Sequence, residues 1–302
     1  MKAITFATFG GPEVLHLSDV PVPAPPAGTI RVRVKAVGVN PADWKIRRGW
    51  FESQFHTSLP SIPGSEIAGV VDAIGDGVAG VAVGDEVLGW AEGGAYAEFA
   101  IARTFTRKAP GVSWDVAAAL PVAGEVAQRV LNLLNVQRGE TLLVNGAAGS
   151  VGTIAVQLAV ARGATVIGTA SPDNLEYVRS LGALPVLYGD GLVERVRAVA
   201  PQGVNAVFDA AGKGALPAAI TLAGGAARVI TIADVDAAKY GVRFSAGTPA
   251  DRSVSALAAL VAQVAAGAVR VTIARTFPLA RAAEAQRISE DGHVRGKLVL
   301  SI

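Results

Sequence analysis

The stretch TLLVNGAAGSVGTIAVQLAVA, residues 141–161, decides the fold of this chain. A short apolar run comes first, then glycines at positions 146, 149 and 152, and then apolar residues at helical spacing. Glycines let the backbone turn sharply and let a ligand come close, and the free N–H groups of a new helix attract phosphate. A second apolar run follows at 165–168, so the order strand, glycine turn, helix and strand predicts a pyrophosphate-binding site.

The composition predicts a globular protein of two domains. The chain has 302 residues, of which 51% are hydrophobic and 17% charged, a balance that excludes intrinsic disorder. The formal net charge is +2, and the basic residues are dispersed apart from a short cluster at Lys45, Arg47 and Arg48. Because nucleic-acid binding requires a dense basic face, we expect no nucleic-acid partner.

The lack of cysteine limits the possible chemistry of the protein, and two segments of the chain indicate its location in the cell. Disulfides and thiolate-bound zinc are excluded in a chain without cysteine. Residues 1–11 are typical of a strand and a turn rather than of a signal peptide. The most apolar window, 255–271, is too short and too weakly apolar to span a bilayer, and it predicts a buried helix. We therefore expect a soluble, cytoplasmic protein with no membrane partner.

The order of the predicted elements indicates an α/β protein. In the first third, residues 30–37 alternate between apolar and basic side chains, and short apolar runs at 67–74, 86–89 and 95–101 follow between glycines, which favours a small bent β-barrel. In the middle third, apolar runs alternate with helical stretches, as in a doubly wound parallel sheet. These runs lie at 141–144, 165–169, 185–188, 205–209 and 227–232.

The predicted domain boundaries follow from the size of such a sheet. About six strands complete it, so the helix over 279–290 and the strand over 297–301 are expected to return to the first domain. We predict one domain over 1–123 and 267–302, and a second over 124–266.

Six segments, spread over essentially the whole chain, carry a resemblance to a known family. They are GVNPADWKIRRG (38–49), PGSEIAGVV (63–71), AALPVAGEVA (118–127), GAAGSVG (146–152), RSLGA (179–183) and RGKLVL (295–300). In these segments the chain resembles the zinc-independent quinone oxidoreductases, the zeta-crystallin-like branch of the medium-chain dehydrogenase/reductase superfamily. The resemblance implies a GroES-like catalytic domain, a Rossmann domain, NADPH in the cleft between them, a quinone or conjugated carbonyl as substrate, and a homodimer.

The end of the second parallel strand predicts the choice of cofactor. An acidic residue about 20 positions after the glycine turn would bind the ribose of NAD and repel a 2′-phosphate. Ala170 and Ser171 stand there instead, which favours NADPH, although Ser171 before Pro172 is equally typical of a helix N-cap. Asp173, where relatives often carry lysine or arginine, opposes a 2′-phosphate, and Arg179 and Tyr188 are candidates to compensate.

The predicted cofactor contacts lie in the glycine turn, at the ends of strands and near the start of the second domain. They are Gly146, Ala147, Ala148, Gly149, Ser150, Val151, Gly152, Ala170, Ser171, Asn174, Tyr188, Val126, Ala210, Ile232 and Ala233. Relatives often have a threonine at position 126, so a side-chain hydrogen bond is lost there.

The residues that zinc-dependent relatives use for metal are missing. Those relatives need a cysteine where Asn40 stands and a histidine where Ser65 stands, and the three histidines of this chain are scattered singly. We therefore predict no metal site and a direct hydride transfer from NADPH, without flavin, to an acceptor that is already electrophilic. Glu66, a carboxylate near the metal in zinc relatives, is predicted to be a paired, buried charge.

Three residues of one segment are the predicted catalytic set. Asn40 offers an amide to ribose, carboxamide or substrate oxygen, and Lys45 would stabilise a developing oxyanion and supply a proton. The alternative for Lys45 is a place on a solvated basic helix face. Asp43 is expected to orient its neighbours through hydrogen bonds. Four aromatic residues are expected in loops that rim the cleft, namely Trp50, Phe51, Phe55 and Trp90.

These residues predict an NADPH-dependent quinone oxidoreductase. An alkenal or enoyl reductase is the nearest alternative, because it needs the same cofactor and the same support for an oxyanion. A non-catalytic NADPH-binding structural or regulatory protein is the alternative from another class.

Overall fold

The chain folds into two units that are each defined by their internal contacts. The structure, a computed structural model, describes residues 1–53 and 56–302. Unit 1 contains Met1–Val122, Ser253–Ala268 and Thr272–Ile302, and unit 2 contains Ala123–Arg252 and Val269–Val271. This division departs from the expected one mainly at residues 253–266, which belong to unit 1 because helix α8 (Val254–Ala265) contacts strand β6 (Phe99–Arg107).

Unit 1 is built on a sheet of order β13-β14-β3-β4-β5-β6, closed by an additional pairing of β3 with β6. Its long strand β3 pairs with β14, β4 and β6, and the alternating residues Ile30, Val32 and Val34 are buried, as predicted for this segment. The bounds are β3 Ile30–Val39, β4 Glu66–Ile74, β5 Glu86–Glu92, β6 Phe99–Arg107, β13 Ile273–Pro278 and β14 Lys297–Ser301.

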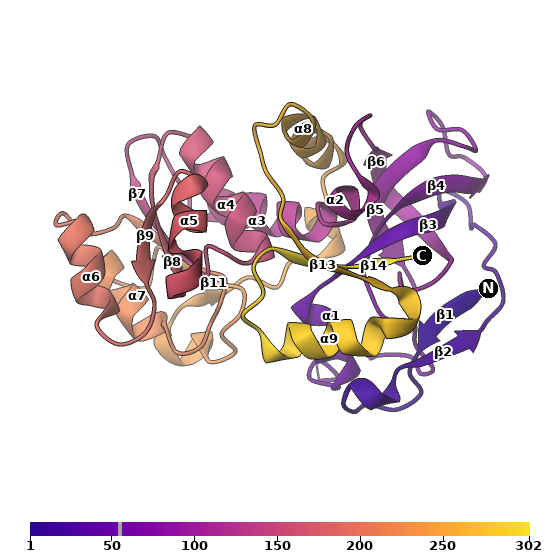
Figure 1. Ribbon diagram of the computed structural model, residues 1–302, viewed down its shortest axis with the longest axis horizontal. Coiled ribbons are helices and arrows are strands. Elements are labelled where there is room, and N and C mark those ends of the chain that lie inside the picture. The colour runs from indigo at the N-terminus through magenta and orange to yellow at the C-terminus, as the bar shows by residue number, and fades with distance from the viewer. Residues whose placement is uncertain (54–55) are drawn as a thin grey trace. The chain divides into compact units, whose positions relative to one another are not determined.

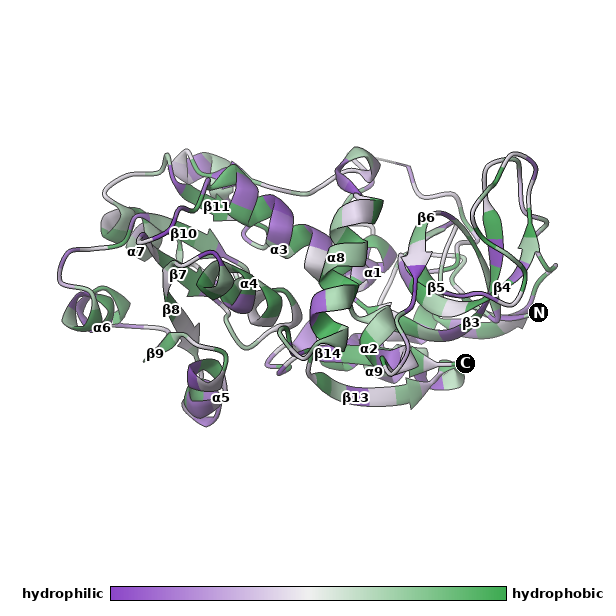
Figure 2. Ribbon diagram, turned by 90° about the horizontal axis from the view of Figure 1, so that it is seen from above, coloured by the Kyte–Doolittle hydropathy of each residue, from purple (hydrophilic) through white to green (hydrophobic). Residues whose placement is uncertain are grey.

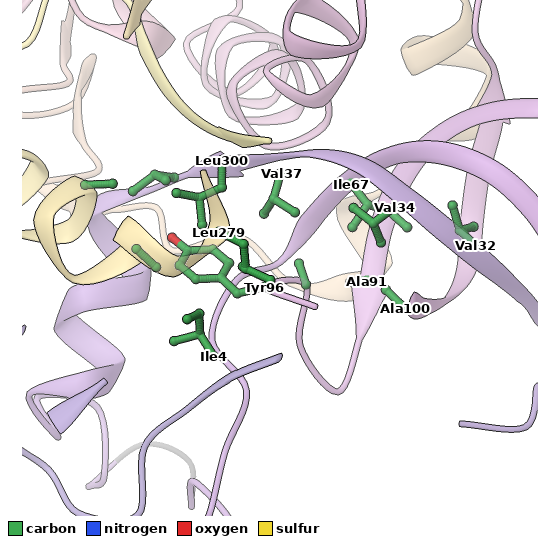
Figure 3. Packing of buried hydrophobic residues seen from close by; sticks show 14 of the residues in the cluster. Ile4, Val32, Val34, Val37, Ile67, Ala91, Tyr96, Ala100, Leu279 and Leu300 are labelled. Atoms are coloured by element: carbon green, nitrogen blue, oxygen red, sulfur yellow. The ribbon is translucent and has the colours of Figure 1, made fainter. Parts of the chain in front are cut away.

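Short elements surround this sheet. They are β1 (Lys2–Thr5) and β2 (His16–Asp19), which form a hairpin-like pair, and the helices α1 (Pro41–Arg47), α2 (Trp114–Ala118) and α9 (Ala282–Asp291). The apolar core packs between these elements and the sheet, and Figure 3 shows the ring of Tyr96 among Ile4, Val37, Leu279 and Leu300.

Two expectations for unit 1 are corrected. The run 95–101 is only partly a strand, because the N–H groups of Ala95 and Tyr96 both donate to the carbonyl of Pro63 and form a bend before β6 begins. Helix α8 is not buried all round. Its residues are mostly hydrophobic (Figure 2), yet only Leu257, Leu260 and Val261 on one face are buried. The other faces consist largely of alanine, whose small side chain gains little from burial.

Unit 2 is a six-stranded parallel sheet of order β12-β11-β10-β7-β8-β9, which is the predicted doubly wound arrangement. Its strands are β7 Thr141–Asn145, β8 Thr165–Ala170, β9 Leu184–Leu187, β10 Ala206–Asp209, β11 Val229–Thr231 and β12 Arg243–Phe244. Its helices, which surround the sheet (Figure 1), are α4 Ser150–Ala161, α5 Leu175–Ser180, α6 Leu192–Val199 and α7 Leu216–Ala223, and α3 spans Pro121–Leu133.

Among the helices of residues 1–53 and 56–302, none combines the length and hydrophobicity needed to cross a bilayer.

Candidate active site

The glycine turn of unit 2 lies between β7 and α4, as the sequence predicted. Gly146 follows β7 directly and has a φ of +83°, a left-handed conformation that favours glycine. Gly149 is the N-cap of α4 and provides no side chain to cap the helix. A methyl group at Gly152 would lie 2.1 Å from the carbonyl oxygen of Gly146, so this glycine allows the helix to approach the turn closely.

Gly149 differs from the other two glycines because nothing inside the protein requires it. Its φ is −74°, which any residue adopts, and a methyl group there would meet only the carbonyl oxygen of Gly146, at 3.5 Å. The space beside the start of α4 is therefore kept open, next to N–H groups that suit an anion. Gly146 makes the turn, Gly149 leaves room for a ligand and Gly152 permits close packing of the helix. This combination is the one that holds a dinucleotide pyrophosphate.

Most of the predicted cofactor residues lie at the carboxyl edge of this sheet. Ala170 ends β8, Ala210 follows β10, and Ile232 and Ala233 follow β11. The backbone N–H of Ile232 donates to the carbonyl of Asp209 (3.0 Å). Ala147 and Ala148 are buried beneath the turn, whereas Ser150 and Val151 are half-buried. Val126 is half-buried in α3.

Ser171 does not use its side chain as a helix cap. It precedes the short 3₁₀ turn Pro172–Asn174, but no cap hydrogen bond forms, and its Oγ accepts one from Asn174 Nδ2 at 2.9 Å. The hydroxyl hydrogen of Ser171 therefore remains available, which removes the alternative reading of this residue as a cap. Asp173 is exposed.

Of the two residues expected to compensate for Asp173, one is engaged elsewhere. Arg179 pairs with Glu176 one turn earlier in α5. Tyr188 lies beside the end of β8, where its N–H donates to the carbonyl of Ala170 (3.4 Å), and its side chain is exposed. Arg195, which the sequence did not single out, donates to the carbonyls of residues 187–190 and supports this segment.

In unit 1, Asn40 lies in a buried polar cluster with Glu66 and Lys297. Lys297 Nζ donates to Asn40 Oδ1 (2.6 Å) and pairs with Glu66 Oε1 (2.5 Å), while Asn40 Nδ2 donates to Glu66 Oε1 (2.8 Å). The other oxygen of Glu66 accepts from the N–H of Val122 (2.7 Å). Glu66 and Lys297 are almost fully buried, so the predicted paired, buried charge at Glu66 is confirmed. The Asn40 amide keeps one N–H.

Asp43 lies in the first turn of helix α1, and its side chain caps the start of that helix. Its Oδ2 accepts from the N–H of Asn40 (2.9 Å) and from the hydroxyl of Tyr96 (2.9 Å). Burial raises the pKa of Asp43 to about 7, although the two hydrogen bonds and the charge of Lys297 act in the opposite direction. These contacts would let Asp43 orient Asn40 and Tyr96, which is the role that the sequence predicts for this residue.

Lys45 is half-buried at the end of the same helix. Its Nζ lies 5.6 Å from the ring centroid of Trp44, and burial lowers the pKa of its ammonium group. The neighbouring Arg47, grouped with it as a basic cluster, is fully buried and bonded to Gln286, Gly10 and Glu290. The helix end is therefore not a uniformly solvated basic face.

The four predicted aromatic residues lie in different environments. Trp50 is 55% exposed and meets Trp44 edge-on with 5.0 Å between ring centroids. Phe51 is half-buried in the following turn, and Phe55 lies outside the described residues. The prediction for Trp90 is wrong, because it lies within β5, directly opposite Glu66, and is only 3% exposed. The apolar run at 86–89 stops one residue before Trp90 and glycines follow at 93 and 94, so the sequence placed the end of this strand too early.

Ser65 is half-buried immediately before β4, and its carbonyl accepts a hydrogen bond from the N–H of Ala91 (3.0 Å). Within residues 1–53 and 56–302, no three histidine, cysteine or acidic side chains are grouped as a metal site would require.

The sequence analysis did not identify Lys297 or Tyr96 as members of these sites. Lys297 stands in RGKLVL, one of the segments that carried the resemblance, and a lysine in an otherwise apolar final strand was the available signal. Nothing in the sequence pairs Tyr96 with Asp43, since they are 53 positions apart. Asp209 ends an apolar run of the parallel sheet, where the sequence is compatible either with a place near the nicotinamide or with ordinary strand termination.

The chain is similar to known dehydrogenases and quinone oxidoreductases. The family models that match are an alcohol dehydrogenase GroES-like domain, at residues 26–112, and a zinc-binding dehydrogenase, at residues 181–300. Among curated relatives, the chain is 31% identical to human quinone oxidoreductase over 99% of this chain and 97% of that protein. It is 40% identical to the rat quinone oxidoreductase over 58% of this chain, a match that spans only 54% of the rat protein. An NADPH-dependent alkenal/one oxidoreductase of Arabidopsis thaliana is 32% identical over 99% of this chain and 79% of that protein.

Solved structures extend the similarity to the fold of the whole chain. The quinone oxidoreductase from Coxiella burnetii superposes with a TM-score of 0.89 at 33% identity, covering 100% of this chain and 99% of that one. The Escherichia coli quinone oxidoreductase complexed with NADPH superposes with a TM-score of 0.88 at 27% identity, covering 100% of both chains. Because the identity to human quinone oxidoreductase is 31% over nearly the whole length of both proteins, the chain belongs to the quinone oxidoreductases of the medium-chain dehydrogenase/reductase superfamily.

Proposed function

We propose that this protein is an NADPH-dependent quinone oxidoreductase that works without metal and without flavin. The observation that carries the proposal is the glycine turn of unit 2, where Gly149 leaves open space in front of the free N–H groups of α4. The residues of the turn fit a dinucleotide. When bound, NADPH supplies a hydride.

The end of β8 supports the 2′-phosphate form of the cofactor. Ala170 brings no carboxylate, and Ser171 keeps a hydroxyl hydrogen that can be donated to a phosphate oxygen. The N–H groups at the start of α4 would hold the pyrophosphate, and the Tyr188 segment, fixed by Arg195, would flank the adenosine end.

Residues of unit 1 would receive the acceptor. A quinone that accepts a hydride becomes a hydroquinone anion, and one further proton completes the reduction. Lys45 has a half-buried ammonium group, so its positive charge would stabilise this anion and its proton would neutralise it. Asn40, anchored by Lys297 and Glu66, would offer its remaining N–H.

No zinc is needed for this reaction, and the chain lacks the residues with which its zinc-dependent relatives hold the metal. It has no cysteine, and asparagine and serine stand at 40 and 65 where zinc relatives carry ligands. An acceptor that is already electrophilic does not require a Lewis acid.

The proposal is tested by following NADPH oxidation with phenanthrenequinone as the acceptor, and NADH as the alternative donor. We expect turnover that depends on the quinone and a clearly higher kcat/KM for NADPH. Preference for NADH would overturn the cofactor assignment. Tight NADPH binding without turnover would favour a non-catalytic binding protein.

A second candidate function is reduction of the carbon–carbon double bond of an alkenal or enone. It is favoured by the similarity over 99% of this chain to an NADPH-dependent alkenal/one oxidoreductase. The same oxyanion support would serve an enolate. Parallel assays with an α,β-unsaturated aldehyde decide between the two, since the better substrate has the higher kcat/KM.

We also propose that the protein is a homodimer of the cytoplasm. Three exposed hydrophobic side chains, Val235, Tyr240 and Phe244, lie in the edge strand β12 or in the segment before it, and a sheet edge beside such residues favours association. Light scattering after size-exclusion chromatography tests the dimer, and cell fractionation tests the compartment.

A further inference from the structure

A line of buried polar side chains crosses the carboxyl edge of the sheet in unit 2. Thr169, Asn145, Asp209 and Thr231 come from the neighbouring strands β8, β7, β10 and β11. Asn145 pairs in register with Asp209, and Asp209 with Thr231. All four are buried, three of them completely. A polar line in this position is costly unless every member is hydrogen-bonded.

Each hydrogen bond in this line has a defined direction. Thr169 Oγ1 donates to Asn145 Oδ1 (2.6 Å), and Asn145 Nδ2 donates to Asp209 Oδ1 (2.8 Å). From the other side, Thr231 Oγ1 donates to Asp209 Oδ2 (2.7 Å). The hydrogen bonds thus converge on the carboxylate of Asp209 from both sides.

The same groups hold the three loops that follow these strands. Thr169 Oγ1 accepts from the N–H of Gly146 (3.0 Å), which is the first residue of the glycine turn. Asp209 Oδ1 accepts from the N–H groups of Ala211 (3.2 Å) and Gly212 (2.9 Å). Thr231 Oγ1 accepts from the N–H groups of Ala233 (3.1 Å) and Asp234 (3.0 Å).

These loops also pack directly on one another. A methyl group at Gly146 would lie 2.9 Å from Cβ of Ala211, and one at Gly212 would lie 3.2 Å from the backbone of Ala233. A shift in one loop would therefore disturb the next.

From this arrangement we infer that Asp209 is a positioning residue that sets the cofactor-binding loops of unit 2. Through Thr169, Asn145 and Thr231 it aligns the glycine turn with the loops that begin at 210 and 232. The inference rests on the proposed NADPH function, because those loops hold predicted contacts of the pyrophosphate and nicotinamide half. Both carboxylate oxygens of Asp209 accept hydrogen bonds from groups of the protein itself, so its proposed action on the cofactor is indirect.

The chemistry requires a carboxylate at position 209. All four groups that face its two oxygens are donors: the amide of Asn145, the N–H groups of Ala211 and Gly212, and the hydroxyl of Thr231. An asparagine would turn an N–H toward one of them. The hydroxyl of Thr231 cannot accept it readily, since it already accepts two backbone N–H groups.

The test compares Thr231→Val, which removes the hydroxyl at constant shape, with Thr231→Ser, which keeps it. The Kd of NADPH and that of adenosine 2′,5′-bisphosphate, which represents the Ser171 half of the cofactor, are measured by fluorescence titration or calorimetry. We expect Thr231→Val to weaken NADPH binding by about tenfold, to leave the bisphosphate within about twofold, and Thr231→Ser to restore NADPH binding. Asp209→Asn and the pair Thr169→Val and Thr169→Ser should give the same pattern.

Hydrogen exchange of the backbone amides provides a readout that needs no cofactor. Thr231→Val should speed exchange at Gly212, Ala233 and Asp234 while amides in α6 keep their protection. Unchanged exchange together with unchanged NADPH binding would overturn the inference. An equal loss of both ligands would also overturn it, because it would indicate a general structural role. Failure of the wild-type protein to bind NADPH would instead overturn the proposed function, and hydrogen exchange would still decide whether Asp209 orders the loops.

Discussion

Asp43 illustrates how a single buried residue can make stability depend on pH. Burial raises its pKa from 3.8 to about 7, so the folded protein keeps a proton on Asp43 that the unfolded chain has already lost. Between these two values the folded state binds more protons than the unfolded state. Stability from this group is therefore present at low pH and declines as pH rises toward 7.

Replacing Asp43 with asparagine should remove this decline. An asparagine oxygen can accept from both Asn40 and Tyr96, because both donate to the same carboxylate oxygen. We expect Asp43→Asn to stabilise the protein at about pH 8 relative to about pH 5, by up to roughly 2.5 kcal/mol. Urea unfolding of both proteins at the two pH values measures the difference, and parallel pH profiles would contradict the assignment.

Lys45 is the residue whose loss should affect the reaction most. Removing its ammonium group takes away the proposed proton donor and the positive charge beside the oxyanion, so Lys45→Ala should lower kcat with a quinone by about 100-fold. The Kd of NADPH and the Tm should change little. Arg48→Ala is the matched control, because Arg48 is an exposed cation of the same segment that pairs with Glu290. Equal kcat values for the two variants would assign Lys45 to the solvated surface.

At the scale of an element, two glycines of the segment from β7 through the turn to α4 should affect different properties, one NADPH binding and the other stability. Gly149 and Gly152 lie three residues apart, yet only Gly152 is required by internal packing. Gly149→Val places a side chain in the open space in front of α4, in a backbone conformation that valine tolerates. We expect it to weaken NADPH binding by about 100-fold or more, with an unchanged Tm.

Gly152→Ala is the companion to this variant. Its methyl group would meet the carbonyl of Gly146, so it should destabilise the protein by about 2 kcal/mol in denaturant unfolding. If Gly149→Val destabilised the protein and kept its NADPH affinity, the assignment of the open space to the cofactor would be wrong.

At the scale of the whole molecule, the path of the chain between its units depends on a few specific contacts. Residues 269–271 belong to unit 2, although the segments on both sides belong to unit 1. Gln157 of α4 holds this short segment, because its Oε1 accepts from the N–H of Arg270 (2.8 Å) and its Nε2 donates to the carbonyl of the same residue (2.9 Å).

Gln157→Leu should release this segment without disrupting the fold of either unit. Leucine leaves both backbone groups of Arg270 unpaired, so limited proteolysis should cleave near 266–272 several times faster than in the wild type. Gln263→Leu, at an exposed position of α8, should leave the cleavage rate unchanged. Equal rates for the two variants would show that Gln157 does not anchor the segment.

Much of the fold could be predicted because its signals are local. The glycine turn at 146–152, the alternation in β3 and the apolar runs of the parallel sheet each reflect short-range rules of turns and strands. The predictions failed where burial on one face depends on a distant partner. Trp90 was expected in a loop, but it lies buried in β5. Helix α8 was expected to be buried, but only one of its faces packs against the rest of unit 1.

The sequence by itself determined the order of the elements, the nucleotide-binding turn and the lack of metal-binding cysteine. Only the tertiary structure decided how the polar residues are connected. Lys297 meets Asn40 across 257 positions, and Asp209 meets Asn145 across 64. The reason is physical: a buried charge is stable only with partners, and the pairing of strands, rather than their local sequence, decides which partners it finds.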